Sequence, residues 1–239
     1  MNAATLTPTN PRQIAVLLRG EPEVTYAWTE QWDSRRAAFY VLVIFVGTGL
    51  YGAAMGYWRD PIQALYTGIK FPLVILLTTL GNGLLNGMLA PLLGINISFR
   101  QSLSAVLMSF TIAATILGSF APVVFFLIWN MPPMAPGIER TTAYPFLLLV
   151  QVGVIAFAGI VANVRLLQLL ERLGGSAAVA RKTLLAWLAA NLFFGSQLSW
   201  ILRPFVGSPG LPVEFLRGNA FQGNFFEAVI FAARKFFAD

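Results

Sequence analysis

Five long apolar stretches, each free of Asp, Glu, Lys and Arg except at its ends, dominate this sequence. They cover approximately residues 37–58, 71–93, 103–129, 143–164 and 183–202. A helix needs about 20 apolar residues to cross the roughly 30 Å hydrocarbon core of a bilayer. Because every stretch reaches this length, the sequence predicts an all-α integral membrane protein, a bundle of about five transmembrane helices.

The composition supports the membrane class and excludes much chemistry. Only 11% of the residues are charged, whereas an average soluble domain carries about a quarter. Cys and His are both absent, which removes thiolate nucleophiles, Cys-ligated zinc and every His-dependent triad or relay. No nucleotide-binding or hydrolase motif is present either. We therefore expect no enzyme and no cofactor.

Shorter apolar segments predict amphipathic helices lying at the membrane interface. One runs from Pro11 to Arg19 and is closed by Gly20, a second from Pro61 to Lys70, and a third over residues 224–237. The expected organisation is an N-terminal cytoplasmic or interfacial segment (1–36), a five-helix transmembrane domain (37–202), and a Pro/Gly-rich loop with a C-terminal amphipathic helix (203–239).

The distribution of basic residues predicts the orientation. Nine of the 16 fall on the side of the N-terminus, and the Arg35-Arg36 pair directly precedes the first stretch. We therefore expect a cytoplasmic N-terminus, and we place the chain in a bacterial inner membrane because no cleavable signal peptide is visible. The net charge of +6 is dispersed between the spans, which favours anionic lipid headgroups over nucleic acid as a partner.

Small residues recur at helical spacing in the first two spans. Gly52 and Gly56 lie four residues apart in the first span, and Gly83 and Gly87 form a GxxxG pattern in the second. Such patterns let helix backbones approach closely. We expect these glycines to pack the first two spans together.

Several amides lie within the spans, where lipid offers them no hydrogen bond. They are Asn82, Asn86, Gln151, Asn163, Asn191 and Gln197. Two interpretations remain open: these side chains bond neighbouring helices, or they line a polar cavity.

Aromatic residues at span ends are typical interfacial anchors. Trp58 ends the first span, Trp129 ends the third, and Trp200 with Arg203 ends the fifth. We expect all four side chains to lie at the membrane surface.

The five-span layout resembles the Yip1-like integral membrane proteins. Lys70-Phe71-Pro72-Leu73 is similar to the entry into a span in bacterial members, and Leu93-Gly94-Ile95-Asn96 followed by Phe99-Arg100-Gln101-Ser102-Leu103 is similar to their turn into the next. The resemblance covers about residues 37–202. Eukaryotic members act as trafficking adaptors through small GTPases, but their longer cytosolic region is missing here, so that role is not transferred.

A second likeness concerns Arg181-Lys182-Thr183, which resembles the basic signature of actin-binding WH2 motifs. We interpret it as the positive flank of a span. The leading hypothesis is a non-enzymatic scaffold, anchor or accessory subunit with homo- or hetero-oligomeric membrane protein partners. The alternative is a transporter or channel for a small solute or lipid, with the six amides along its path.

Overall fold

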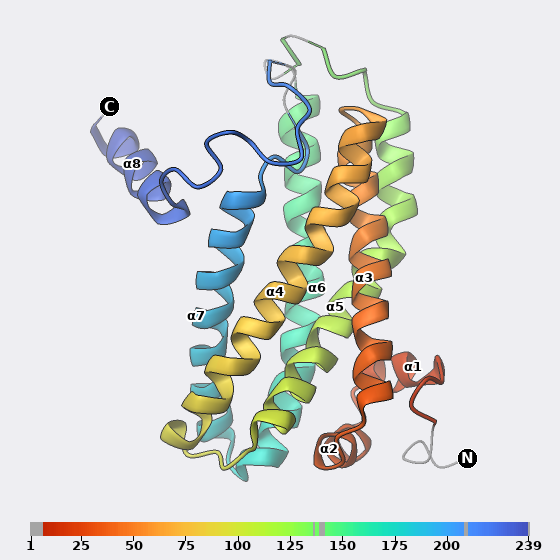
Figure 1. Ribbon diagram of the computed structural model, residues 1–239, viewed down its shortest axis with the longest axis vertical. Helices are drawn as coiled ribbons and strands as arrows, with labels where there is room; N and C mark the ends of the chain where they lie inside the picture. Colours follow the sequence, from red (N-terminus) through yellow and green to blue (C-terminus); the bar gives the residue numbers. More distant parts are fainter. Residues whose placement is uncertain (1–6, 136, 139–141, 208–209, 239) are drawn as a thin grey trace.

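The computed structural model describes residues 7–135, 137–138, 142–207 and 210–238, and in this part of the chain it is all-helical (Figure 1). Eight helices are found among the described residues. They are α1 (Arg12–Arg19), α2 (Pro22–Glu30), α3 (Ser34–Tyr57), α4 (Pro61–Leu93), α5 (Phe99–Trp129), α6 (Ala143–Gly174), α7 (Ala177–Leu202) and α8 (Phe225–Ala238).

Helices α3 to α7 are long and apolar enough to cross a membrane, which confirms the predicted five-span, all-α class. They run alternately up and down, so α1 and α8 lie at opposite ends of the bundle (Figure 1). The spans contact one another in the ring order α3, α4, α7, α6, α5, and α4 also contacts α5. The chain is therefore a polytopic membrane protein by its helix lengths and composition.

The predicted interfacial helix from Pro61 to Lys70 is wrong as a separate element. In the structure it is the first part of α4, which continues without interruption through Pro72. Proline removes the hydrogen bond to the carbonyl four residues earlier, here that of Gly68. This carbonyl faces α3, where a Cβ on Gly49 would lie only 3.1 Å from it. Close packing between the two helices thus supports the segment around Pro72.

The predicted helix before Gly20 is confirmed as α1, which ends at Gly20 in the left-handed conformation (φ 69°). Helix α2 was not predicted. Both helices pack against the bundle, chiefly on α5 and α6. Trp28 of α2 is buried, and the guanidinium of Arg36 lies 4.8 Å from the centre of its ring. The N-terminal segment is therefore part of the packed molecule.

The turn between α4 and α5 follows local sequence signals. Gly94 closes α4 with a φ of 95°, a conformation that favours glycine. Ser98 precedes α5 and forms a capping box. Its side chain accepts a hydrogen bond from the backbone N–H of Gln101, and the Gln101 side chain accepts one from the backbone N–H of Ser98. Such reciprocal bonds satisfy donors that a helix start leaves unpaired.

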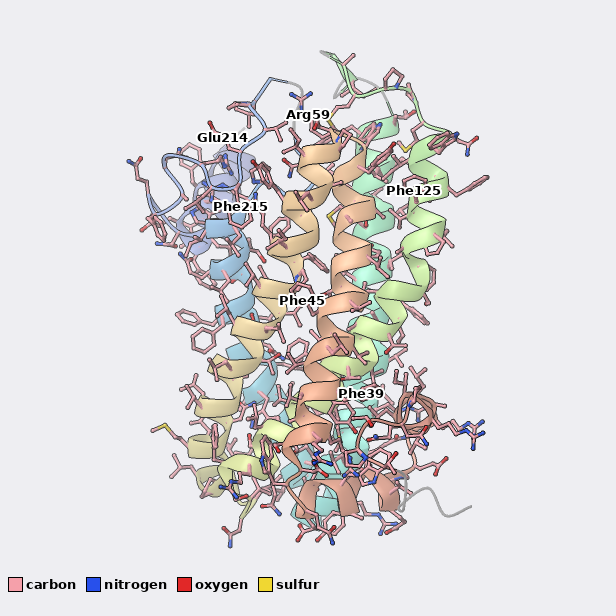
Figure 2. All side chains as sticks on the ribbon, turned by 45° about the vertical axis from the view of Figure 1, so that its right-hand side comes forward. Phe39, Phe45, Arg59, Phe125, Glu214 and Phe215 are labelled. Atoms are coloured by element: carbon pink, nitrogen blue, oxygen red, sulfur yellow. The ribbon has the colours of Figure 1, made fainter. Side chains whose placement is uncertain are left out.

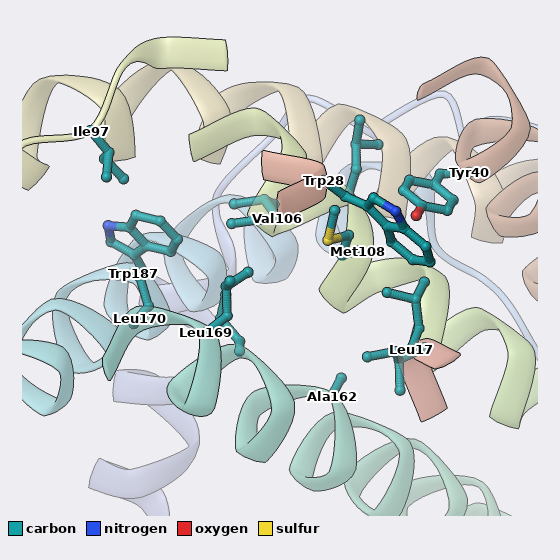
Figure 3. Packing of buried hydrophobic residues seen from close by; sticks show 14 of the residues in the cluster. Leu17, Trp28, Tyr40, Ile97, Val106, Met108, Ala162, Leu169, Leu170 and Trp187 are labelled. Carbon is teal, nitrogen blue, oxygen red and sulfur yellow. The ribbon is translucent and has the colours of Figure 1, made fainter. Parts of the chain in front are cut away.

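Two buried apolar clusters fill the bundle, one toward each end. The cluster at the N-terminal end joins Leu17 and Trp28 of the first helices to Tyr40, while Trp187 of α7 lies on its other side near Ile97 (Figure 3). The second cluster forms between α3, α5 and α6 and extends to the loop after α7. The short N-terminal helices thus complete the first cluster.

The C-terminal region carries the predicted helix, α8, beyond an irregular loop. Helix α8 stands away from the bundle and contacts α7 among the spans (Figure 1). Helix α7 itself begins at Ala177, earlier than the predicted Thr183, so Arg181 and Lys182 lie within its first turns.

Candidate functional site

The asparagines of α4 lie at its contact with α7. The side-chain amide of Asn82 donates a hydrogen bond to the side-chain oxygen of Asn191. One turn earlier, a Cβ on Gly195 would lie 3.8 Å from the hydroxyl of Thr78. One turn later, Asn86 is buried, and its side-chain oxygen has no hydrogen-bond partner among the described residues. Asn82 and Asn191 therefore contribute to the antiparallel packing of α4 on α7.

The other amides lie at separate places. Gln151 of α6 accepts a hydrogen bond from the hydroxyl of Tyr51 on α3, inside the second core cluster. Asn163 donates to the carbonyl of Gly159 in its own helix, at 2.7 Å. Gln197 of α7 accepts from the backbone amide of Phe225 at 3.2 Å, which links α7 to the start of α8.

The six amides thus do not surround one common cavity. Asn82 with Asn191, Gln151 and Gln197 form hydrogen bonds at three different helix contacts. Asn163 bonds to its own helix, and Asn86 is buried one turn from Asn82. Four of the six side chains thus form hydrogen bonds between helices, of the kind that the helix-bonding interpretation expects.

Gly52 and Gly56 place α3 directly on the backbone of α4. A Cβ on Gly52 would lie 2.6 Å from the carbonyl oxygen of Thr67, and one on Gly56 would lie 2.6 Å from that of Gln63. Such distances are too short for any side chain. The contact between the first two spans depends on these glycines.

Gly83 and Gly87 contact a different helix from the one we expected. A Cβ on Gly83 would lie 2.9 Å from Leu103, and one on Gly87 would lie 3.3 Å from Phe99. Both neighbours belong to α5, so this pair packs the second and third spans. The expectation that it packs the first two spans together is wrong, because α4 crosses from α3 at one end to α5 at the other.

The span-end tryptophans divide into buried and exposed residues. The expectation for Trp58 is wrong: only 7% of it is exposed, and its ring nitrogen donates to the Pro132 carbonyl at 3.0 Å. It belongs to the second core cluster because the loop after α5 covers it. Trp129 is 69% exposed at the end of α5, and Trp200 is partly exposed at the end of α7.

A polar ridge on α4 binds the loop that follows α7, and sequence reasoning missed it. Gln63, Thr67 and Lys70 lie one turn apart along the helix and are fully or almost fully buried. Gln63 donates to the carbonyls of Pro204 and Phe205, both at 3.0 Å. Thr67 donates to the same Phe205 carbonyl at 2.7 Å.

Lys70 ends this ridge. Its amine donates to the carbonyls of Pro204 at 3.2 Å and Glu214 at 3.3 Å, and it lies 5.3 Å from the ring centre of Phe215. Figure 2 shows Glu214 and Phe215 at the end of the bundle opposite the N-terminal helices. Lys70 thus holds a buried charge between α4 and the loop, using backbone oxygens in place of a carboxylate.

Two arginines belong to the region that follows α7, Arg203 and Arg217. The positive charge of Arg217 acts on both Lys70 and Arg203. Burial lowers the pKa of the Arg203 guanidinium, and the charge of Arg217 lowers it further. Within the described residues none of these three cations forms an ion pair, and the pair found there joins Arg172 to Glu23. Lys70, Arg203 and Arg217 thus lie at this end of the bundle without an ion pair among the described residues.

No arrangement for metal binding occurs in the part of the chain that the structure describes, because no three acidic residues gather there. Comparisons with protein-family models, curated proteins and solved structures find no match for this chain. The resemblance to Yip1-like proteins stays a prediction. Of its motifs, residues 70–73 lie inside α4, and residues 93–96 form the end of α4 and the turn that follows it.

Proposed function

We propose that this protein is a non-enzymatic subunit, scaffold or anchor of a larger membrane assembly, and that a partner protein covers α7. The observation that supports this proposal is that the hydropathy of α7 does not match its exposure. It is the least apolar of the five candidate spans, and it is also the least buried, with 6% of its most apolar window inside the molecule against 44% for α3. Less apolar spans normally lie inside a bundle, because lipid satisfies no polar group.

The uncovered part of α7 is a continuous face. Leu185, Ala189, Leu192 and Ser196 follow one another at helical spacing, and Leu185 and Leu192 are 67% and 71% exposed. We name these four residues the α7 outer face. A second transmembrane helix packed there would bury the least apolar span of the molecule.

The chemistry of the spans supports a structural role. Four of the six in-span amides, Asn82, Gln151, Asn191 and Gln197, form hydrogen bonds between helices of the chain, and no metal-binding cluster occurs among the described residues. The partner is a membrane protein, either a second copy of this chain or a different one.

Site-specific photo-crosslinking in the native membrane tests the proposal. A photoreactive residue at Leu192 should yield a discrete protein adduct, which mass spectrometry then identifies. The matched control is Leu149 on α6, equally exposed at 70%, where we expect lipid adducts alone. Purification in a mild detergent should give a particle larger than the 26.1 kDa chain. A monomeric particle without a protein adduct at Leu192 would contradict the proposal.

We also propose that the N-terminus faces the cytoplasm of a bacterial inner membrane. The chain contains no cysteine, so the labelling of a single introduced cysteine shows on which side of the membrane that residue lies. A cysteine replacing exposed Gln222 should react with an impermeant maleimide added outside the cell, whereas one replacing exposed Ser176 should react only after permeabilisation. The reverse pattern would invert the orientation.

A further inference from the structure

A groove lies between the end of α7 and the start of α8. It has a volume of about 390 Å³, and Trp200, Arg203, Phe205, Phe225 and Val229 are among its lining residues. Helix α8 stands off from the bundle here (Figure 1). The lining is mostly apolar, and Arg203 provides a cation at its edge.

Arg203 is positioned at this edge by α7. Its guanidinium carbon lies 3.2 Å from the ring centre of Trp200, and its Nη1 donates to the Trp200 carbonyl at 2.9 Å. A guanidinium has five N–H donors in a planar fork that matches phosphate oxygens. One bond to a carbonyl leaves donors for such an anion.

Arg217 adds a second cation. Its Nε is buried without a hydrogen-bond partner among the described residues, and its charge acts on Arg203. Glu214 and Glu227 belong to the same region, but within the described residues neither forms an ion pair with these arginines. Two like charges that act on each other favour binding of an anion.

We propose that the groove between α7 and α8 binds an anionic phospholipid, with its phosphate at Arg203, its negative charge attracted also by Arg217, and an acyl chain along Trp200, Phe225 and Val229. The positive charge of the arginines favours an anion as the ligand. Because the groove is lined by apolar residues at the end of a candidate span, this anion should also carry a hydrocarbon chain. A soluble phosphate would contact only the basic part of the site, whereas a phospholipid would contact both the basic part and the apolar lining. Basic sites at span ends bind such headgroups in this way.

The experiment measures binding of short-chain phosphatidylglycerol to the purified full-length protein in neutral detergent. Phosphatidylcholine of the same chain length is the neutral-headgroup comparison. Each basic residue near a headgroup contributes about fivefold in affinity, so Arg203→Gln combined with Arg217→Gln should weaken phosphatidylglycerol binding about thirtyfold. The control pair, Arg181→Gln with Lys182→Gln at the other end of α7, should leave binding unchanged.

A second variant tests the apolar groove independently of the charge of the arginines. Val229→Trp fills the groove without altering an arginine, and it should weaken phosphatidylglycerol binding while the protein keeps its helical circular dichroism and elution volume. Three results would overturn the proposal: equal binding by the arginine variant and its control, equal binding of phosphatidylcholine, or inorganic phosphate competing at the concentration at which the lipid binds. The last result would identify a site for soluble anions.

Discussion

The amine of Lys70 lies 3.2 Å from the carbonyl oxygen of Pro204, a residue 134 positions later in the chain. Lys70 is fully buried, and its other hydrogen bond goes to the carbonyl of Glu214. One side chain of α4 therefore fixes both ends of the segment 204–214. This segment includes Phe205, which lines the groove beside α8.

Replacing Lys70 should release that segment. Lys70→Met keeps the apolar stem but removes the donors, and hydrogen bonds to charged groups contribute about 1.5–3 kcal/mol. We expect amide hydrogen exchange across residues 205–216 to rise about tenfold or more. Lys182→Met, at an exposed position in α7, is the control and should leave exchange unchanged. Identical exchange in both variants would mean that the loop is held without the amine.

The α3–α4 contact should tolerate no side chain at Gly52. Gly52→Ala would place its Cβ 2.6 Å from the carbonyl oxygen of Thr67 and 2.9 Å from Phe71, and because the first of these is backbone, the helices must separate. Overpacking of this kind costs about 1–3 kcal/mol. The thermal unfolding temperature in detergent should fall accordingly.

Gly153 offers the matched control for this prediction. It also lies within a candidate span, but nothing lies within 4 Å of a Cβ built there. Gly153→Ala should leave stability unchanged or raise it by up to about 1 kcal/mol, since alanine favours a helix over glycine. A loss of stability equal to that of Gly52→Ala would show that the close contact with α4 does not determine the effect.

The five spans could be predicted because their signals are local. Each is a continuous apolar run, and turn or capping residues such as Gly94 and Ser98 mark where the chain reverses. The continuation of α4 through Pro72 could not be predicted in this way. Proline is locally a helix breaker, and what supports it here is the glycine face of α3, which no local pattern connects to it.

At the candidate site, the residues around Lys70 also show that a local sequence pattern does not reveal distant partners. The spacing of Gln63, Thr67 and Lys70 is a visible polar stripe, and it could have indicated a buried ridge. Its partners, the carbonyls of Pro204 and Phe205, carry no side-chain signal and lie more than 130 residues away. Trp58 was misjudged for a similar reason, because the loop that covers it begins 72 residues later.

The hydrogen bond from Tyr51 to Gln151 should stabilise the contact between α3 and α6 measurably. Tyr51→Phe removes the donor, and the Gln151 amide nitrogen already lacks a partner among the described residues. Interhelical bonds in membranes contribute about 0.6 kcal/mol on average and up to about 1.7. A double-mutant cycle with Gln151→Leu, read from unfolding in detergent, should give a coupling energy in this range. Asn163→Ala, which removes a bond within one helix, should show no coupling to Tyr51→Phe.

Two arginines of α6 contact the N-terminal helices, and we expect only one of them to hold these helices in place. Arg165 is partly buried and donates to the Leu18 carbonyl at 3.2 Å, whereas the ion pair of Arg172 with Glu23 is exposed on both sides. Exposed ion pairs contribute at most about 1 kcal/mol, while a charged donor to a part-buried carbonyl contributes about 1.5–3 kcal/mol.

A cysteine at buried Thr29 would report the opening of α1 and α2, because the chain has no other thiol. In the Arg165→Met background its maleimide labelling rate should rise about tenfold or more, since the contact with Leu18 is lost. In the Arg172→Gln background the rate should change less than about fivefold, as expected for an exposed pair. A larger increase with Arg172→Gln would show that the exposed ion pair, and not the buried contact, keeps the N-terminal helices on the bundle.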